Sequence, residues 1–429
     1  MEISKLSNEL YMVTTRAPVN IAVVKYWGKA NEDLILPLND SLSLTLSTDD
    51  LCAQTTVAVG KHFTEDRIWL NGREESVKFP RIQNCLNEIR RRGKQAQEQR
   101  KSDIVPDYTD WHVHISSVNN FPTAAGMASS AAGYACLVHC LGTLFQVEGD
   151  LSAIARRGSG SACRSMYGGF VRWVKGERED GQDSIAQQIA PVDHWPELRV
   201  LILVCDSHVE VLQGVHAMKS GIPKGTAAHV VANDQKKETG STSGMGSSVQ
   251  TSTLLKYRAS TVVPQRIKDM TEAILKKDFN KFAEITMQES NQLHAICLDT
   301  YPPIRYMNRI SWDIVSMVHR YNDFYKANRV AYSFDAGPNA FLFTLEEYLP
   351  EVMSVMRRSF PSTLEGIKGS LWRGAPGPSK PLPHKLQDHL KIIPQVDVLK
   401  YAFVTKVGDG PQTVSDFRQH LLDIRGMPK

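Results

Sequence analysis

The sequence predicts an α+β fold, built either as two domains or as one large unit with two lobes. A chain of 429 residues is long enough for more than one hydrophobic core. Strand-like and helix-like segments follow one another without the regular strand–helix repeat of a parallel α/β sheet. Hydrophobic residues make up 42% of the chain and charged residues 22%, which is the composition of an ordinary globular protein.

The first part of the chain is rich in strand patterns and then turns helical. Residues 20–24 are largely β-branched and apolar, and residues 41–48 alternate between polar and apolar side chains, so both segments predict strands. Residues 67–72 give a shorter strand signal. From Arg81 the apolar spacing becomes helical, and the end of this helix carries a basic run. We favour a solvated helix end over a nucleic-acid patch, because no aromatic residues interleave the charges.

The remaining elements follow from the same patterns of periodicity and turn residues. Strands are expected at 111–120, 168–174, 198–205, 329–334, 341–345 and around 401–407, and helices from about 129, over 151–165, twice within 267–296 and around 310–318. The apolar strand at 198–205 is expected to open the second lobe.

Composition excludes several classes of function. A formal net charge of +4 is small for a general nucleic-acid binder. The seven cysteines are odd in number and form no C-x-x-C motif, so we expect reduced thiols inside the cell and neither a disulfide framework nor a zinc site. No run of about 18 apolar residues predicts a membrane span. The final residues, GMPK, are not the Ser-Lys-Leu peroxisomal ending, and the sequence does not decide a peroxisomal association.

Two lysines follow directly on the first apolar strand. Lys25 and Lys29 bracket two aromatic residues and a glycine in the segment KYWGK, Lys25 to Lys29. A simple hairpin would use Asn-Gly or Asp-Gly at such a turn. Two ammonium groups four residues apart, held by rigid aromatic packing, instead favour an anion-binding edge.

A loop of small residues leads into the helix near Ser129. In NNFPTAAGMASSAAG, Asn119 to Gly133, the small side chains leave backbone N–H groups uncovered, and the helix N-terminus adds its positive dipole. This pattern favours a phosphate cradle, although it is not a Walker A motif. The alternative, a small-residue helix packed tightly on a sheet, stays open on spacing alone.

Three further segments carry polar groups suited to phosphates or carboxylates. RRGSGSACRS offers a loop from Gly158 to Ser161 followed by Arg164, whose planar fork fits carboxylate or phosphate. TGSTSGMGSSVQTS, from Thr239, is again rich in hydroxyls and glycine, and Asp335 ends a strand at a Gly-Pro turn in FDAGPNA. Taken singly, each also fits a plain alternative: a flexible turn, a linker or an ordinary turn aspartate. Together they suggest a nucleotide and a second phosphorylated substrate.

These segments together resemble the mevalonate diphosphate decarboxylase family of the GHMP kinase superfamily. PTAAGMASSA is similar to the nucleotide loop of the whole superfamily, whereas KYWGK and GSGSACRS are much narrower signatures of the decarboxylases. APVNIAVVKYWGK, GSTSGM and FDAGPNA add to the resemblance, which runs from about Thr15 to the C-terminus.

The resemblance implies a two-lobed GHMP-kinase-like fold with the active site in the cleft between the lobes. An N-terminal lobe, 1–195, is expected to carry the nucleotide loop and the substrate's diphosphate edge, and a C-terminal lobe, 196–429, the catalytic aspartate. The implied reaction is ATP- and Mg²⁺-dependent decarboxylation of (R)-5-diphosphomevalonate to isopentenyl diphosphate, with ADP, phosphate and CO₂, in isoprenoid and sterol biosynthesis. The resemblance also implies a homodimer that binds a small-molecule substrate. From the thiols, the net charge and the hydropathy we expect a cytoplasmic protein with no nucleic-acid binding and no membrane insertion.

The same resemblance assigns roles to individual residues. Asp335 resembles the catalytic carboxylate, Arg164 the group that holds the substrate carboxylate, and Lys25 the cationic neighbour of the aspartate. The positions similar to substrate-binding residues are Asn20, Tyr26, Trp27, Gly28, Lys29, Arg81, Ser159, Gly160, Ser161, Ala162, Cys163, Ser241 and Thr242. The ATP loop corresponds to Gly126, Met127, Ala128, Ser129 and Ser130, with the hydroxyl of Ser129 or Ser130 near Mg²⁺.

Some features depart from the family pattern. Residues 206–235 are longer than the family's usual connection and precede the Ser241 segment directly, so we expect a surface insertion that could impair activity. Met127 and Asp40 are smaller departures. Two alternatives therefore stay open beside the active decarboxylase: a GHMP-type kinase that stops after phosphorylation, and a catalytically impaired or silent binding protein.

Overall fold

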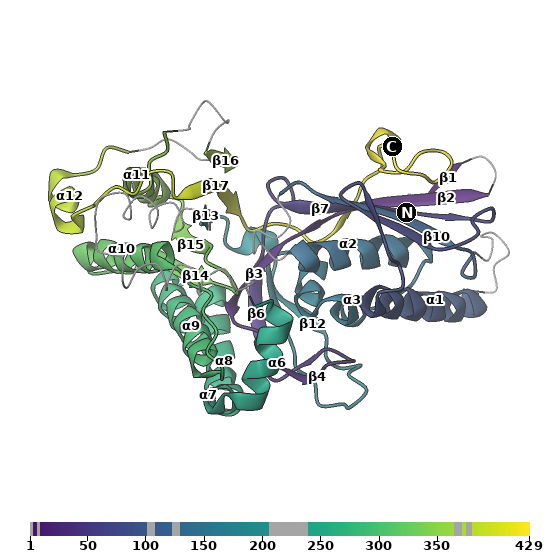
Figure 1. Cartoon of the computed structure of the whole chain (residues 1–429), viewed down its shortest axis with the longest axis horizontal. Helices are drawn as coiled ribbons and strands as arrows, with labels where there is room; N and C mark the ends of the chain where they lie inside the picture. The colour runs from purple at the N-terminus through teal and green to yellow at the C-terminus, as the bar shows by residue number, and fades with distance from the viewer. Residues whose placement is uncertain are drawn as a thin grey trace, which may run out of the picture. The chain divides into compact units, whose positions relative to one another are not determined.

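The computed structural model describes residues 3–6, 9–100, 108–121, 129–205, 239–363, 371–374 and 380–429 (Figure 1). The expected insertion at 206–235 and the ATP-loop residues Gly126, Met127 and Ala128 lie outside the described residues. The chain divides into two compact units: unit 1 is Met1–Pro196, Tyr257–Lys277 and Lys406–Lys429, and unit 2 is Glu197–Lys256 and Asp278–Thr405. The continuous lobes 1–195 and 196–429 stay a prediction.

Unit 1 combines two principal sheets with helices and short 3₁₀ turns. Its elements are β1 (Ser4–Leu6), β2 (Leu10–Pro18), β3 (Asn20–Val24), β4 (Lys29–Asn31), β5 (Leu36–Pro37), β6 (Ser41–Thr45), β7 (Cys52–Gly60), β8 (Arg67–Leu70), β9 (Arg73–Glu75), α1 (Pro80–Arg100), β10 (Val113–Asn119), α2 (Ser129–Leu144), α3 (Ser152–Gly158), the 3₁₀ helix η1 (Gly160–Met166), β11 (Phe170–Trp173), β12 (Ala186–Ala190), η2 (Val192–His194), the π-helical turn η3 (Arg258–Val262), α8 (Val263–Leu275), β18 (Gln412–Thr413) and η4 (Phe417–Gln419).

The larger sheet of unit 1 has the order β1-β2-β7-β10-β8-β9, with β18 added along β2. Helix α2 packs on β2 and β7, and α1 and α3 pack beside α2 (Figure 1). Small side chains on α2 allow this close approach: the Cys136 thiol donates to the Thr15 carbonyl at 3.0 Å, and the Cys140 thiol to the Thr55 carbonyl at 3.1 Å. The body of α2 is thus a small-residue helix packed tightly on a sheet, which is the alternative that the sequence left open for this segment.

The smaller sheet of unit 1 has the order β12-β11-β6-β3 and carries most of the candidate site. Both β3 and β6 are buried along their whole length. Helix α8 packs on β3, β6 and β12, and η1 packs on the same sheet as well as on α2 and α3. Because apolar and polar residues are buried together here, the polar side chains must find partners inside the unit.

Unit 2 has a five-stranded sheet in the order β14-β15-β13-β17-β16. Helices α9 and α10 pack on β14, α12 packs on α10, and α6 packs on α9 (Figure 1). The elements are β13 (Leu198–Cys205), α6 (Ser241–Thr251), α7 (Thr253–Tyr257), α9 (Phe279–Asp299), α10 (Arg309–Tyr325), β14 (Val330–Phe334), β15 (Ala340–Leu345), α11 (Leu349–Ser359), β16 (Trp372–Gly374), α12 (His384–Leu390) and β17 (Leu399–Lys406).

The α+β class and most of the predicted elements are confirmed, but two segments differ. The expected hydrogen-bonding loop at Gly158–Ser161 ends α3 and begins the 3₁₀ helix η1. The hydroxyl- and glycine-rich segment after Thr239 forms helix α6, although its composition favours a loop. Burial of Gly244, Met245 and Ser248 stabilises α6, since tertiary packing commonly overrides weak helix propensity.

Candidate active site

The two lysines after β3 lie in a turn whose backbone is held by hydrogen bonds at Lys25. The Lys25 side chain is buried, and the Lys25 carbonyl accepts hydrogen bonds from Asn39 Nδ2 at 3.2 Å and from Arg258 Nη2 at 3.1 Å. Gly28 has a φ of +92°, a left-handed conformation that glycine adopts without strain. The buried ammonium group of Lys29 forms an ion pair with the exposed carboxylate of Glu32. A ligand phosphate at Lys29 would therefore compete with Glu32.

Tyr26 and Trp173 form an aromatic wall next to η1. Their ring centroids are 4.7 Å apart, and a Cβ added at Gly160 would lie 2.9 Å from Trp173 Cη2 and 3.0 Å from the Tyr26 hydroxyl. Glycine is therefore required at this position for packing. Burial raises the pKa of Tyr26, so its phenol stays protonated. Within the described part of the chain the buried Tyr26 hydroxyl has no hydrogen-bond partner.

Arg164 is held inside unit 1 by hydroxyl groups from β6. Its side chain is 2% exposed, its Nε donates to Ser43 Oγ at 3.0 Å, and its Nη1 donates to Ser41 Oγ at 2.6 Å. The guanidinium carbon lies 5.9 Å from the centroid of the Trp173 ring. Two fixed hydrogen bonds orient the planar guanidinium for recognition of a carboxylate or phosphate.

Asn20 connects β3 to the same 3₁₀ helix. Its Nδ2 donates to the Ser161 carbonyl at 3.0 Å and to Ser165 Oγ at 2.8 Å. Its buried Oδ1 accepts no hydrogen bond from the residues described. Asn20 therefore fixes η1 on the sheet while one polar atom keeps the capacity to bind a donor.

The start of α2 adjoins the start of η1. Ser130 Oγ, on the first turn of α2, lies 3.3 Å from Ser159 Oγ. That first turn carries no acidic residue, so its N–H groups and helix dipole favour an anion. Gly158 packs directly on Tyr134, where an added Cβ would lie only 2.1 Å from the ring. These contacts bring the predicted nucleotide helix and the predicted substrate segment together.

Cys163 is a buried packing group, whereas Arg81 acts on the site through its charge. Burial raises the pKa of Cys163 to about 12, and its thiol donates to the Gly160 carbonyl at 3.0 Å, so this cysteine is a packing group and not a nucleophile. Arg81, on α1, exerts a field that lowers the pKa of both Tyr26 and Tyr134, although burial outweighs it at each. Arg81 thus contributes positive potential to this site.

In unit 2, Asp335 follows directly after β14. The turn is closed by a hydrogen bond from the Gly337 N–H to the Asp335 carbonyl at 2.8 Å. Ser311 Oγ donates to the Pro338 carbonyl at 2.9 Å, and Asn339 Oδ1 accepts from the Cys205 N–H at 3.0 Å. These contacts attach the Asp335 turn to α10 and β13, so its backbone is rigidly placed at the strand end.

Ser241 and Thr242 form the exposed N-terminal turn of α6. The helix behind them is anchored to α9 and its C-terminal extension, because Ser248 Oγ lies 2.7 Å from Thr300 Oγ1 and Thr251 Oγ1 accepts from the Tyr301 N–H at 2.9 Å. Their hydroxyls thus stand on an ordered helix end and not on a linker.

The structure gathers a subset of the predicted residues around η1. Asn20, Tyr26, Gly160 and Arg164 meet there, and Ser159 joins them to α2. Among the residues described, no cluster of three or more His, Cys, Asp or Glu side chains has a metal-binding arrangement. Also within the described ranges, no helix has the length and hydrophobicity needed to cross a membrane.

Three residues that position the candidate site were not identified from the sequence: Ser41 and Ser43, which bind Arg164, and Arg258, which binds the Lys25 carbonyl. The two serines alternate with leucine in a strand that is buried on both faces. A buried hydroxyl needs a partner, and this is the signal that could have identified them. Arg258 offers no such signal, since it is 233 residues from Lys25 in the chain.

Comparisons with known proteins give consistent matches over nearly the whole chain. A family profile described as "Diphosphomevalonate decarboxylase-like N-terminal domain" matches residues 17–186, and one described as "Mevalonate 5-diphosphate decarboxylase C-terminal domain" matches residues 228–414. The chain is 51% identical to the diphosphomevalonate decarboxylase of Rattus norvegicus, with 97% of each chain covered. It is 51% identical to that of Homo sapiens, with 98% of each covered.

Solved structures give the same result. The mevalonate diphosphate decarboxylase from Trypanosoma brucei is 36% identical with a TM-score of 0.78, covering 96% of this chain and 100% of that one. A structure described as "MDDEF in complex with MVAPP, AMPPCP and Magnesium" is 28% identical with a TM-score of 0.67, covering 95% of this chain and 100% of that one.

Proposed function

The chain belongs to the diphosphomevalonate decarboxylase family, and from that premise we propose how its residues carry out the reaction. The activity is ATP-dependent decarboxylation of 5-diphosphomevalonate, which yields isopentenyl diphosphate, ADP, phosphate and CO₂. The chemical difficulty is that the tertiary hydroxyl at C3 is a poor leaving group, so it must be phosphorylated before CO₂ can depart.

The observation that carries the proposal is the buried, tethered guanidinium of Arg164. We assign it the carboxylate of the substrate, because its fork is oriented by Ser41 and Ser43 inside unit 1. As phosphate leaves C3, positive charge develops there, and a carboxylate held in line can release CO₂ into that electron demand. A kinase that only phosphorylates an alcohol needs no such clamp.

The diphosphate end of the substrate is assigned to the turn after β3 and to η1. Tyr26 keeps its proton and can donate a hydrogen bond, Lys29 supplies a positive charge shared with Glu32, and Arg81 adds positive potential. Ser159 and Ser161 provide hydroxyl and backbone donors at the start of η1. Trp27, Gly28, Ala162 and Cys163 shape the walls that hold these groups.

ATP and Mg²⁺ are assigned to the N-terminal end of α2. The residues fit, since the helix begins without acidic side chains and with hydroxyls at Ser129 and Ser130. Mg²⁺ is usually held by phosphates, water and only one or two protein oxygens, which agrees with a site poor in carboxylates. When bound, Mg²⁺ neutralises charge on the transferring phosphoryl group.

Asp335 is proposed to orient or deprotonate the C3 hydroxyl. Its turn is rigid, so the carboxylate is placed by β14 rather than by a loose loop. Lys25 is proposed to supply the positive charge that supports this step, as the family resemblance implies. Ser241 and Thr242 are proposed to donate to substrate phosphate from the α6 N-terminus, where the helix dipole is favourable.

Location and assembly remain proposals as well. All seven cysteines are buried thiols outside any disulfide, which suits the reducing cytoplasm. The proposal that the protein is a homodimer is based on the family resemblance.

The test is turnover of 5-diphosphomevalonate with Mg·ATP, in which ADP and CO₂ are measured separately. Equal amounts of ADP and CO₂ support the proposal. ADP without CO₂ would establish the kinase alternative, and neither product would establish a silent or impaired protein.

A further inference from the structure

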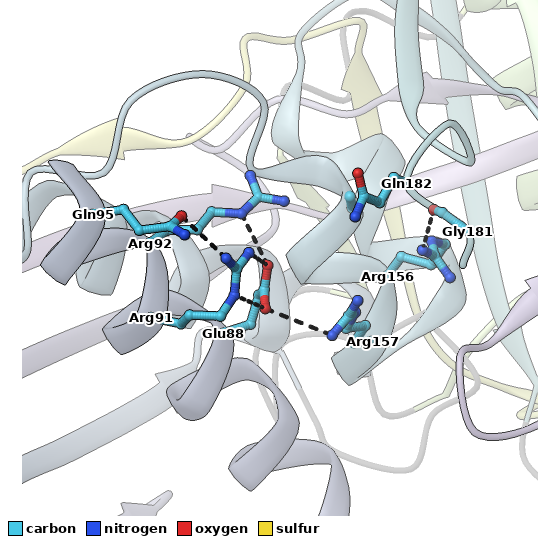
Figure 2. Close-up of a pocket in the computed structure, with 9 residues that line it drawn as sticks. Glu88, Arg91, Arg92, Gln95, Arg156, Arg157, Gly181 and Gln182 are labelled. Atoms are coloured by element: carbon cyan, nitrogen blue, oxygen red, sulfur yellow. Dashed lines mark hydrogen bonds and ion pairs between the residues drawn. The ribbon is translucent and has the colours of Figure 1, made fainter. Parts of the chain in front are cut away.

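A second group of arginines lines a cavity of about 560 Å³ in unit 1, formed by α1, α3 and the segment before β12 (Figure 2). None of the residues assigned above lines it. Arg91 and Arg92 come from the basic run of α1, and Arg156 and Arg157 come from α3. From the sequence we expected the basic end of this helix to be solvated. Part of the basic run instead lines the cavity.

One carboxylate serves three of these arginines. Glu88 accepts two hydrogen bonds from Arg91, at 2.7 and 3.0 Å, and one from Arg92 Nε at 3.0 Å, whereas Arg157 Nη1 is 3.8 Å away. Figure 2 shows Glu88 between the arginines of the two helices. Asp180 also interacts electrostatically with Arg157, but it is itself paired with Arg178, so Glu88 and Asp180 together leave an excess of positive charge at the cavity.

Arg156 adds a fully buried charge. Its guanidinium donates to the carbonyls of Gly181 at 2.8 Å and of Ser184 at 3.0 Å, and it also contacts the Leu34 carbonyl. No carboxylate among the described residues forms an ion pair with it. Burial lowers its pKa to about 10, so it stays protonated at neutral pH. Carbonyl oxygens satisfy the N–H groups but carry no net charge, and Asp183 offsets the buried charge only through its field and not through an ion pair.

We propose that this cavity binds a compact phosphate-class anion, best matched by a diphosphate group. Planar guanidinium forks bind phosphate oxygens in pairs, and three guanidinium groups around one carboxylate favour a ligand with more than one negative charge. The cavity volume lies in the range of small-molecule sites. The concave shape and the polar lining favour a small anion over an extended nucleic acid. The proposal does not depend on the roles assigned to the active-site residues.

Inorganic diphosphate is the probe, titrated calorimetrically into the full chain in Mg²⁺-free buffer of constant ionic strength. The substrate site and the N-terminal end of α2 can also bind phosphate groups, so the diphosphate that binds at the cavity is identified by variants of residues that line it. We expect one diphosphate to bind there. Arg157→Gln removes a loosely paired guanidinium, and Gln182→Glu adds a negative charge at an exposed position, so both should fold normally. Each should weaken binding at least about tenfold, by loss or repulsion of a charge-assisted contact.

The matched control is Arg418→Gln, which removes an exposed arginine that does not line the cavity and should leave the affinity unchanged. Two results would overturn the proposal: no binding of diphosphate to the wild type, or equal affinity in wild type, Arg157→Gln and Gln182→Glu. The binding comparison of the variants does not require turnover. Failure of the proposed decarboxylase function can therefore be distinguished from failure of the proposed anion site.

Discussion

Replacing Ser43 by alanine tests whether the hydroxyls of β6 position Arg164 for decarboxylation. The change removes the acceptor that lies 3.0 Å from Arg164 Nε, at a guanidinium that is 2% exposed and cannot readily turn to water. A hydrogen bond to a charged group contributes about 1.5–3 kcal/mol. If that loss falls on the decarboxylation transition state, the rate constant for CO₂ release decreases roughly 10- to 150-fold.

The assay is a single-turnover experiment in which ADP and CO₂ are followed on the same sample. Arg164 is assigned to the carboxylate, so Ser43→Ala should form ADP at nearly the wild-type rate while CO₂ lags behind it. Arg164→Gln gives the limiting case. Ser41→Ala should resemble Ser43→Ala, and the double variant should be less than additive, because both hydroxyls hold one guanidinium.

Ser359→Ala is the matched control, since it deletes an equally buried serine hydroxyl that donates to the Val355 carbonyl at 2.8 Å. If Ser43→Ala lowers Tm but ADP and CO₂ still appear together at the wild-type rate, the serine has only a structural role. If ADP formation slows as much as CO₂ release, Arg164 acts on binding or phosphorylation, and its assignment to the carboxylate is wrong.

Three further predictions concern Asp335, Gly160 and Glu88. Asp335→Asn should abolish turnover while the Kd for 5-diphosphomevalonate stays near wild type, and a retained rate above about a tenth of wild type would exclude an essential role. Gly160→Ala should destabilise the protein by about 1–3 kcal/mol in urea unfolding and raise KM, because its Cβ meets Trp173 and Tyr26; Gly246→Ala, with open space around it, should do neither. Hydrogen bonds from Arg91 hold the pKa of Glu88 at about 2, below its ordinary 4.5, so this carboxylate stabilises the fold above pH 4.5 and the stabilisation is lost as pH falls toward 2. Between pH 5 and 3 the wild type should therefore lose about 1–2 kcal/mol more than Glu88→Gln, after allowance for the half-exposed Arg91, and equal slopes would show that the pair contributes nothing.

The sequence was informative where local pattern decides structure. The long periodic helices α1, α9 and α10 and the alternating or apolar strands β10, β13 and β14 were all expected. The glycine- and serine-rich segments were harder, because their intrinsic preference is for loops while burial of Met245 and Ser248 decides for a helix.

The site residues also divide into those that a local motif predicts and those that only tertiary contacts bring to the site. Lys25, Tyr26 and Arg164 stand in motifs that can be read from consecutive residues. Ser43 becomes relevant only because β6 lies beside η1, and Arg258 only because it returns to the Lys25 carbonyl from 233 residues away. Such contacts are set by tertiary structure, and no local pattern in one sequence encodes them.

The composition of unit 1 has a consequence for biosynthesis. β18 pairs with β2, Leu422 packs with Leu10 and Met12, and His114 Nδ1 meets the Gly426 carbonyl at 2.8 Å. At about 5–20 residues per second, a ribosome needs roughly 15–60 s to extend the chain by the 312 positions from His114 to Gly426. Throughout that interval the β2 edge and the Leu10 cluster are exposed on the nascent chain, where they invite chaperones or aggregation. The unit whose synthesis begins first is thus the last to be completed.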